Sequence, residues 1–70
     1  MYSIKVKNRK TKKSKWLMIY DEYENDLTLT KDVFGKQEYF SIQSLLDDLK
    51  LILENGWGEK YTFTIIEVDF

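Results

Sequence analysis

The stretch Ser41–Trp57, SIQSLLDDLKLILENGW, carries the clearest structural signal in the chain. Its apolar residues recur at the spacing of one helical face, namely Ile42, Leu45, Leu46, Leu49, Ile52 and Leu53. Ser41 stands where an N-cap residue belongs, and Gly56 follows Asn55 as a residue suited to the left-handed backbone that ends many helices. The sequence therefore predicts one amphipathic helix from about Ser41 to Asn55.

Strand-like segments lie on both sides of this helix. The segment Tyr2–Lys7 alternates apolar and polar residues, which is typical of a strand with one buried face. The run Trp16–Tyr20 is continuously apolar, which is typical of a strand inside a sheet with both faces covered, and Leu27–Thr30 alternates again. A short strand is also expected at Tyr39 and Phe40. After the helix, Lys60–Phe70 has the pattern of a last strand, and a change in the parity of its apolar residues suggests either a bulge or a strand covered on both faces in its second half.

The order of these segments indicates the fold class. The series β-β-β-α-β predicts an α+β protein, with a small, mostly antiparallel sheet of about four strands and one α-helix packed on one face. A chain of 70 residues is expected to form a single domain, residues 1–70, because it is too short to build two hydrophobic cores. The contacts expected between helix and sheet join Leu46, Leu49 and Leu53 to Trp16, Met18, Phe63 and Ile65.

The composition disfavours most kinds of enzyme. The chain has no Cys and no His, so it lacks thiol chemistry, the commonest general base and the commonest transition-metal ligand. Its carboxylates show neither the ordered spacing of a calcium loop nor any feature that separates a catalytic pair from surface acids. We therefore expect a non-enzymatic protein with no catalytic residues, no metal and no cofactor.

The N-terminal segment lacks the features of a targeting sequence. MYSIKVKNRK contains no apolar run like that of a signal peptide, and no segment is long and apolar enough to span a bilayer. The expected location is the cytoplasm, without membrane attachment.

Charge is distributed unevenly along the chain. Residues 1–16 carry a formal charge of +7 and residues 17–70 carry −8, although the net charge is only −1. Carboxylates interleaved with tyrosines can bind a basic groove on a host protein in place of the phosphates of a nucleic acid. The residues that this hypothesis assigns to partner binding are Asp21, Glu22, Tyr23, Glu24 and Asp26.

The alternative hypothesis is a nucleic-acid-binding domain that uses the basic hairpin Lys5–Lys15. Lysine-rich loops bind phosphates through counterion release, and the neighbouring Trp16 can stack on bases. The residues assigned to nucleic acid are then Lys7, Arg9, Lys10, Lys12, Lys13 and Lys15. The single Arg weakens this alternative, because bidentate base contacts are made mainly by arginine. Both charged segments also have an ordinary interpretation as solvated turns.

Two resemblances bear on the function. The segment Lys15–Leu53, three strands followed by a helix, resembles in outline the arm-type DNA-binding domains of tyrosine recombinases, although the corresponding stretch here is acidic. The whole chain, short and without Cys, His, Ala or Pro, resembles the small host-takeover and anti-defence proteins of phages, anti-CRISPR proteins among them. The second resemblance implies a phage or mobile-element inhibitor whose partner is a host protein, for example one that binds nucleic acid.

The number of apolar residues also suggests self-association. Apolar residues of both parities in Trp16–Tyr20 and Ile65–Phe70 exceed what one helix can cover. Exposed apolar patches of this kind commonly mark an interface, and the simplest arrangement is a two-fold homodimer. We therefore expect either a homodimer or an apolar patch that the partner covers.

Overall fold

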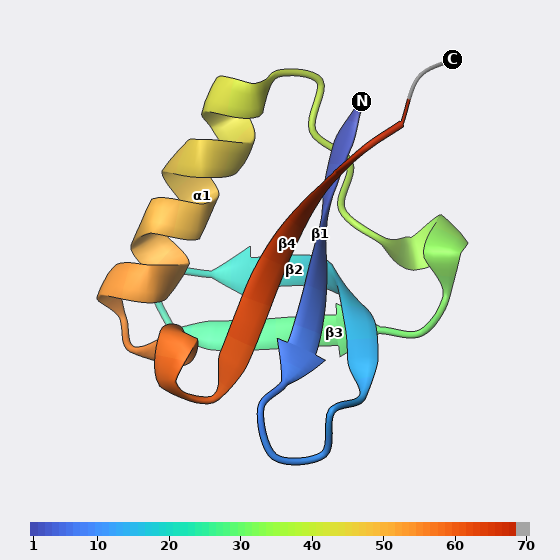
Figure 1. The fold of residues 1–70 in the computed structure, drawn as a ribbon. Coiled ribbons are helices and arrows are strands. Elements are labelled where there is room, and N and C mark those ends of the chain that lie inside the picture. Colours follow the sequence, from blue (N-terminus) through green and yellow to red (C-terminus); the bar gives the residue numbers. More distant parts are fainter. Residues whose placement is uncertain (69–70) are drawn as a thin grey trace.

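The computed structural model describes residues 1–68, and its elements follow the predicted order (Figure 1). The described elements are β1 (Tyr2–Asn8), β2 (Ser14–Asp21), β3 (Asp26–Thr30), the 3-10 turn η1 (Val33–Gly35), α1 (Ile42–Glu54), the 3-10 turn η2 (Trp57–Glu59) and β4 (Tyr61–Glu67). The strands form an antiparallel sheet in the order β3-β2-β1-β4. The predicted α+β fold class is confirmed, and the predicted strand residues Asp69 and Phe70 lie outside the described residues.

The ends of α1 match the sequence prediction. The hydroxyl of Ser41 accepts a hydrogen bond from the backbone N–H of Ser44 at 3.2 Å, as an N-cap does. Asn55 is the C-cap, and Gly56 follows it with a φ of 92°. Glycine adopts this left-handed backbone without the steric cost that a Cβ atom would add. The predicted span Ser41–Asn55 is therefore the helix with its two caps.

The hydrophobic core lies between α1 and the two inner strands, β1 and β2. Its buried hydrophobic residues are Ile4, Val6, Leu17, Tyr39, Leu45 and Ile52. On α1, Leu45 and Ile52 face the sheet and Leu49 beside them is half-buried. The core therefore uses only the central stripe of the helix.

The predicted helix contacts are partly wrong. Leu46 and Leu53 are 42% and 49% exposed, because they lie on one flank of α1 and not on its central stripe. Trp16 pairs with Lys5, whose strand neighbours Ile4 and Val6 are buried under the helix. Side chains alternate between the two faces of a sheet, so Trp16 lies on the face without the helix.

The continuous apolar run of β2 is explained by a bulge. The register between β2 and β3 shifts between Leu17 and Ile19, so that Leu17 and Tyr20 both pack against the core although they are three residues apart. Ile19 remains exposed. The run therefore does not mark a strand covered on both faces, and the bulge predicted for the last strand occurs in β2, since β4 pairs with β1 without interruption.

The segment before α1 lies beside the start of β1. Tyr39 and Tyr2 exchange two backbone hydrogen bonds of 2.8 Å, and the N–H of Gln37 donates to the carbonyl of Leu17 at 2.8 Å. The short strand predicted at Tyr39 and Phe40 is thus a single bridge at Tyr39, and Phe40 is exposed. This bridge places the first turn of α1 over the sheet.

Candidate functional site

The turn between β2 and β3 gathers all the acidic residues that the sequence assigns to partner binding. We call residues 21–26 the acidic turn; its predicted site residues are Asp21, Glu22, Tyr23, Glu24 and Asp26. The carboxylate of Asp21 accepts hydrogen bonds from the backbone N–H groups of Tyr23 (3.0 Å) and Glu24 (3.3 Å). Asn25 has a φ of 50°, a conformation that Asn tolerates better than most residues. Side-chain capping and a left-handed Asn therefore shape the turn.

A hydrogen-bond network attaches the acidic turn to the end of α1. The side-chain oxygen of Asn25 accepts from the Tyr20 hydroxyl at 2.9 Å and from the Trp57 indole N–H at 2.8 Å. The Asn55 amide donates to the Tyr20 hydroxyl at 2.7 Å. Figure 1 shows the β2–β3 connection beside the C-terminal end of the helix, as these bonds require. The network holds the turn in one position relative to α1.

The carboxylates of the acidic turn lack internal compensation. Asp21 and Asp26 stand directly opposite each other across the hairpin, an arrangement of like charges that destabilises a sheet. Within residues 1–68 the only ion pair joins Lys50 to Glu54, at 3.9 Å on the exposed surface of α1. None of the described basic side chains forms an ion pair with the acidic turn, so its carboxylates are available to a cationic partner.

An open hollow of about 380 Å³ lies between the acidic turn and α1. It is lined by Ile19, Tyr20, Asp21, Glu22, Tyr23, Asp48 and Leu51. The lining combines three carboxylates with aromatic and aliphatic walls and contains no cation. Such a surface suits a lysine or arginine side chain, whose stem is apolar and whose tip is cationic.

Asp48 has a fixed position in this hollow. The hydroxyl of the buried Tyr39 donates a hydrogen bond to its carboxylate at 2.7 Å. Burial, and then this hydrogen bond, raise the pKa of Tyr39 above its ordinary value, so the phenol stays a neutral donor. Sequence reasoning did not assign Asp48 to the site. The apolar Leu51, which lies off the core stripe of the helix, was the available signal for this part of the surface.

The structure distributes the basic residues over different parts of the β1–β2 hairpin. Lys7 and Lys15 pair with Ser14 and Val6 at adjacent positions of the β1–β2 ladder, so their side chains leave opposite faces of the sheet. Lys13 and Lys15 line a hollow of about 240 Å³, whereas Lys7 is not part of it. Arg9 and Lys10 line a different hollow, of about 320 Å³, together with Lys60. The six basic residues of the alternative hypothesis therefore lie in small groups on different parts of the hairpin.

Two features offered for nucleic-acid binding are used by the fold itself. The guanidinium of Arg9 donates to the carbonyl of Gly58 at 2.9 Å and so links the β1–β2 loop to η2. The ammonium groups of Lys5 and Lys36 lie 4.0 Å and 4.9 Å from the centre of the Trp16 ring. These cation–π contacts compete with stacking of a base on Trp16. In the loop itself Lys10 and Lys12 are exposed.

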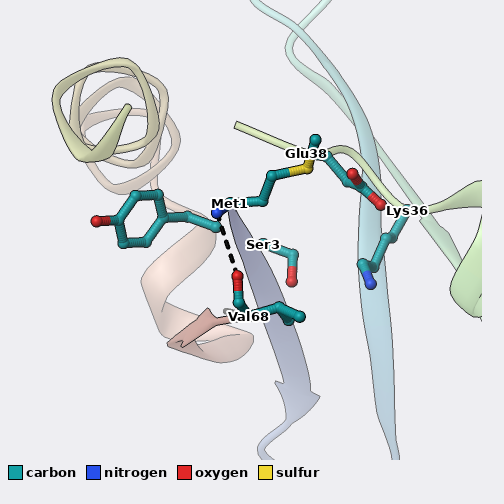
Figure 2. A pocket seen from close by; sticks show the side chains of 6 residues that line it. Met1, Ser3, Lys36, Glu38 and Val68 are labelled. Carbon is teal, nitrogen blue, oxygen red and sulfur yellow. Dashed lines mark hydrogen bonds between the residues drawn. The ribbon is translucent and has the colours of Figure 1, made fainter. Parts of the chain in front are cut away.

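Another, much smaller hollow lies at the beginning of β1 (Figure 2). Its volume is about 20 Å³, which is room for about one water molecule. Ser3 Oγ is buried there without a hydrogen-bond partner among the described residues, and the amino group of Met1 donates to Val68 O at 3.2 Å on one side. This hollow has room for one water molecule that could bond to the Ser3 hydroxyl, and it is too small for a substrate.

Comparisons with known proteins return no match to a family model, a curated protein or a solved structure. In the part of the chain that the structure describes, no three acidic side chains are arranged to hold a metal ion. Among residues 1–68 no helix has the length and apolar character needed to cross a membrane. The function is therefore inferred from the geometry and charge of the acidic turn and its surroundings.

Proposed function

We propose that this chain is a non-enzymatic binding module that docks on a basic surface of another protein through the acidic turn and the adjoining flank of α1. The observation that carries the proposal is the gathering of uncompensated carboxylates around Tyr23, which is 93% exposed at the tip of the turn. A large aromatic side chain in that position is a typical anchor of an interface. The network around Asn25 supports the proposal, because a surface fixed in advance loses little conformational entropy on binding.

The chemistry of the hollow indicates the kind of partner. Carboxylates on the acidic turn and on α1 favour a partner segment rich in Lys or Arg, such as the groove of a protein that binds nucleic acid. The size and composition of the chain, which resemble those of small phage inhibitors, favour a host protein as that partner. In this proposal the carboxylates of the acidic turn bind where the partner would otherwise bind the phosphates of a nucleic acid.

Titrating the ¹⁵N-labelled protein with an oligoarginine peptide, and separately with a short DNA duplex, tests the proposal. We expect the peptide to shift the amide resonances of residues 19–26, Asp48 and Leu51 at about 0.1 M salt, and the shifts to weaken as salt is added. The duplex is expected to leave the spectrum unchanged. Shifts that the duplex causes at Lys10 and Lys12, with none from the peptide at the turn, would favour the nucleic-acid hypothesis instead.

A pair of matched variants supplies the control. The double change Glu22→Lys and Glu24→Lys reverses two exposed charges of the turn, whereas Lys10→Glu and Lys12→Glu reverse two exposed charges of the β1–β2 loop. Exposed charges contribute little to stability, usually within about 0.5 kcal/mol, so both variants should stay folded. We expect the first variant to lose peptide binding and the second to keep it.

A further inference from the structure

β4 is an edge strand whose free backbone groups can be identified from the hydrogen bonds at its end. The N–H of Val68 donates to Met1 O at 2.9 Å, and the amino group of Met1 donates to Val68 O at 3.2 Å. In an antiparallel ladder, residue pairs that exchange two such bonds alternate with pairs that exchange none. In this register the even-numbered residues of β4 bond to β1, as the 3.0 Å bond from Arg9 N to Lys60 O also indicates. The backbone groups of Tyr61, Phe63, Ile65 and Glu67 therefore point away from β1, toward the free edge.

The side chains along this edge are apolar on the face that carries the helix. Ile65 and Phe63 pair with Ile4 and Val6, which are buried under α1, so all four side chains leave the same face. Natural edge strands are usually protected from pairing with other strands by lysines, prolines or bulges. The sequence YTFTII of residues 61–66 contains no charge and no proline, and β4 contains no bulge. Along residues 61–66, β4 thus lacks the usual protection of an edge, and its one charged residue, Glu67, stands at the end of the strand.

One flank of α1 extends the same apolar surface. The opposite flank carries Asp48 and Asn55, which bond to Tyr39 and Tyr20 on the β2 side of the molecule. Successive helical residues are about 100° apart, so the flank without Asp48 and Asn55 lies on the other side of the buried stripe. That flank faces the β4 side, since Leu53 also reaches Gly58 just before β4. It consists of the exposed residues Ile42, Leu46 and Leu53.

We propose that this β4 edge pairs with the β4 edge of a second copy of the chain, in an antiparallel, two-fold dimer centred on Thr64. Residues with outward backbone groups must stand opposite each other, which allows only odd-numbered residues to form the hydrogen-bonded pairs. Centring on Thr64 uses the whole strand and places Phe63 opposite Ile65 of the second copy. Aromatic and β-branched residues are a favourable cross-strand pair. In this register both helices lie on the same face of the joined sheet, on either side of the joined strands.

Charge at the ends of β4 favours a second copy over an unrelated strand. The register places Glu67 opposite Tyr61 of the other copy, and the Lys60 ammonium lies 5.4 Å from the centre of the Tyr61 ring. Each end of the paired strands thus brings one carboxylate near one ammonium. A two-fold interface requires a surface that is complementary to itself, and this edge meets that requirement in its backbone groups, its apolar side chains and its charges.

Disulfide formation by single-cysteine variants tests the register, because the chain has no Cys of its own. Thr64 and its symmetry mate form a non-hydrogen-bonded pair with Cα atoms about 4.5 Å apart, which lies within the range of disulfides. Thr64→Cys should give most of the chain as a covalent dimer after mild oxidation at tens of micromolar. The matched control is Thr62→Cys, because Thr62 is exposed on the same strand, as Thr64 is. Its two sulfurs would be separated by about four residues, or ~13 Å, so it should stay monomeric. A monomeric Thr64→Cys, or equal cross-linking of both variants, would overturn the proposal.

The mass of the unmodified protein in solution gives a second readout. Sedimentation at about 100 µM should report twice the 8.5 kDa of one chain. Ile65→Lys, at the proposed interface, should reduce this to one chain while the circular dichroism spectrum is retained. Thr28→Lys on β3, at the other edge of the sheet, should remain a dimer. A monomeric unmodified protein would contradict the proposal. Glu22→Lys with Glu24→Lys should not change the mass, so the dimer and the proposed partner binding can fail separately.

Discussion

The two flanks of α1 contact different parts of the molecule and do so with different chemistry. On one flank, Asn55 donates a hydrogen bond to Tyr20, which in turn bonds to Asn25 of the acidic turn. On the same flank Asp48 accepts a hydrogen bond from Tyr39, in the segment before the helix. On the other flank, Ile42, Leu46 and Leu53 are exposed beside the free edge of β4. The polar flank has directed bonds and a fixed geometry, which suits selective recognition. The apolar flank can bury surface but makes no directed bonds. In the proposed dimer the backbone hydrogen bonds of the β4 edge would therefore fix how the two copies align.

The largest effect is expected in the buried stripe that separates the two flanks. Ile52→Ala should lower the free energy of unfolding by about 2–5 kcal/mol, because Ile52 is fully buried and its truncation leaves a cavity. Leu46 lies on the exposed apolar flank, so Leu46→Ala should lower the free energy of unfolding of the monomer by less than about 1 kcal/mol. Urea unfolding measures both. Equal losses would mean that the helix packs on the sheet through more residues than Leu45, Leu49 and Ile52.

Asn25 tests how firmly the polar flank holds the acidic turn. Asn25→Gly removes the acceptor of the Tyr20 and Trp57 hydrogen bonds but keeps a residue that accepts the positive φ. The expected loss is about 0.5–1.5 kcal/mol for each hydrogen bond, because both bonds are exposed and water can replace the lost acceptor. Hydrogen exchange of residues 21–26 should accelerate in this variant. Unchanged exchange would show that the turn is held by its backbone alone.

Tyr39 gives the stability a dependence on alkaline pH. Its pKa is raised in the folded protein by burial and by the hydrogen bond to Asp48, so the folded state keeps a proton that the unfolded chain loses near pH ~10. The contribution is complete below that pH and is lost as the pH rises toward the higher pKa of the folded protein. The free energy of unfolding should fall by up to about 1.4 kcal/mol per pH unit above pH ~10. Tyr39→Phe should flatten this slope; an unchanged slope would exclude Tyr39 as its source.

The smallest effect concerns the opposed carboxylates of the acidic turn. Asp26→Asn should stabilise the protein by about 0.2–1 kcal/mol, because it removes the repulsion from Asp21 across the hairpin. The same change should slow association with a basic peptide, since the charge of the turn attracts it. A thermal melt and stopped-flow mixing measure the two effects. A variant that is less stable would show that Asp26 contributes more through local bonds than it costs through repulsion.

The helix and the order of strands were predictable because their signals are local. The cap at Ser41, the apolar spacing and Gly56 lie within one segment and define α1 without any knowledge of its neighbours. The acidic turn was predictable for the same reason, because its carboxylates are consecutive or nearly so in the sequence. Binding by this turn, by contrast, is a proposal that the fold does not test.

The remaining features depend on contacts between distant parts of the chain. Leu46 and Leu53 fit the helical apolar pattern as well as Leu45 does, and only the position of the sheet decides which of them is buried. The bulge was predicted in β4, whereas the shift that brings Leu17 and Tyr20 to one face occurs in the pairing of β2 with β3. Trp57 follows the end of α1 in the sequence, and its indole N–H donates to Asn25, 32 residues away. Patterns within one segment carry no information on such pairings.

The proposed role of the acidic turn is tested most directly by comparing the proteins that the matched charge variants retain from a lysate of the cells in which this protein is made. The unmodified protein and the Lys10→Glu, Lys12→Glu variant are expected to retain the same protein, whereas Glu22→Lys with Glu24→Lys is expected to lose it while remaining folded. The retained protein should present a basic surface, and its release by salt should be steep because complementary charge drives the encounter. Retention of the partner by the acidic-turn variant, together with its loss from the lysine variant, would contradict the account.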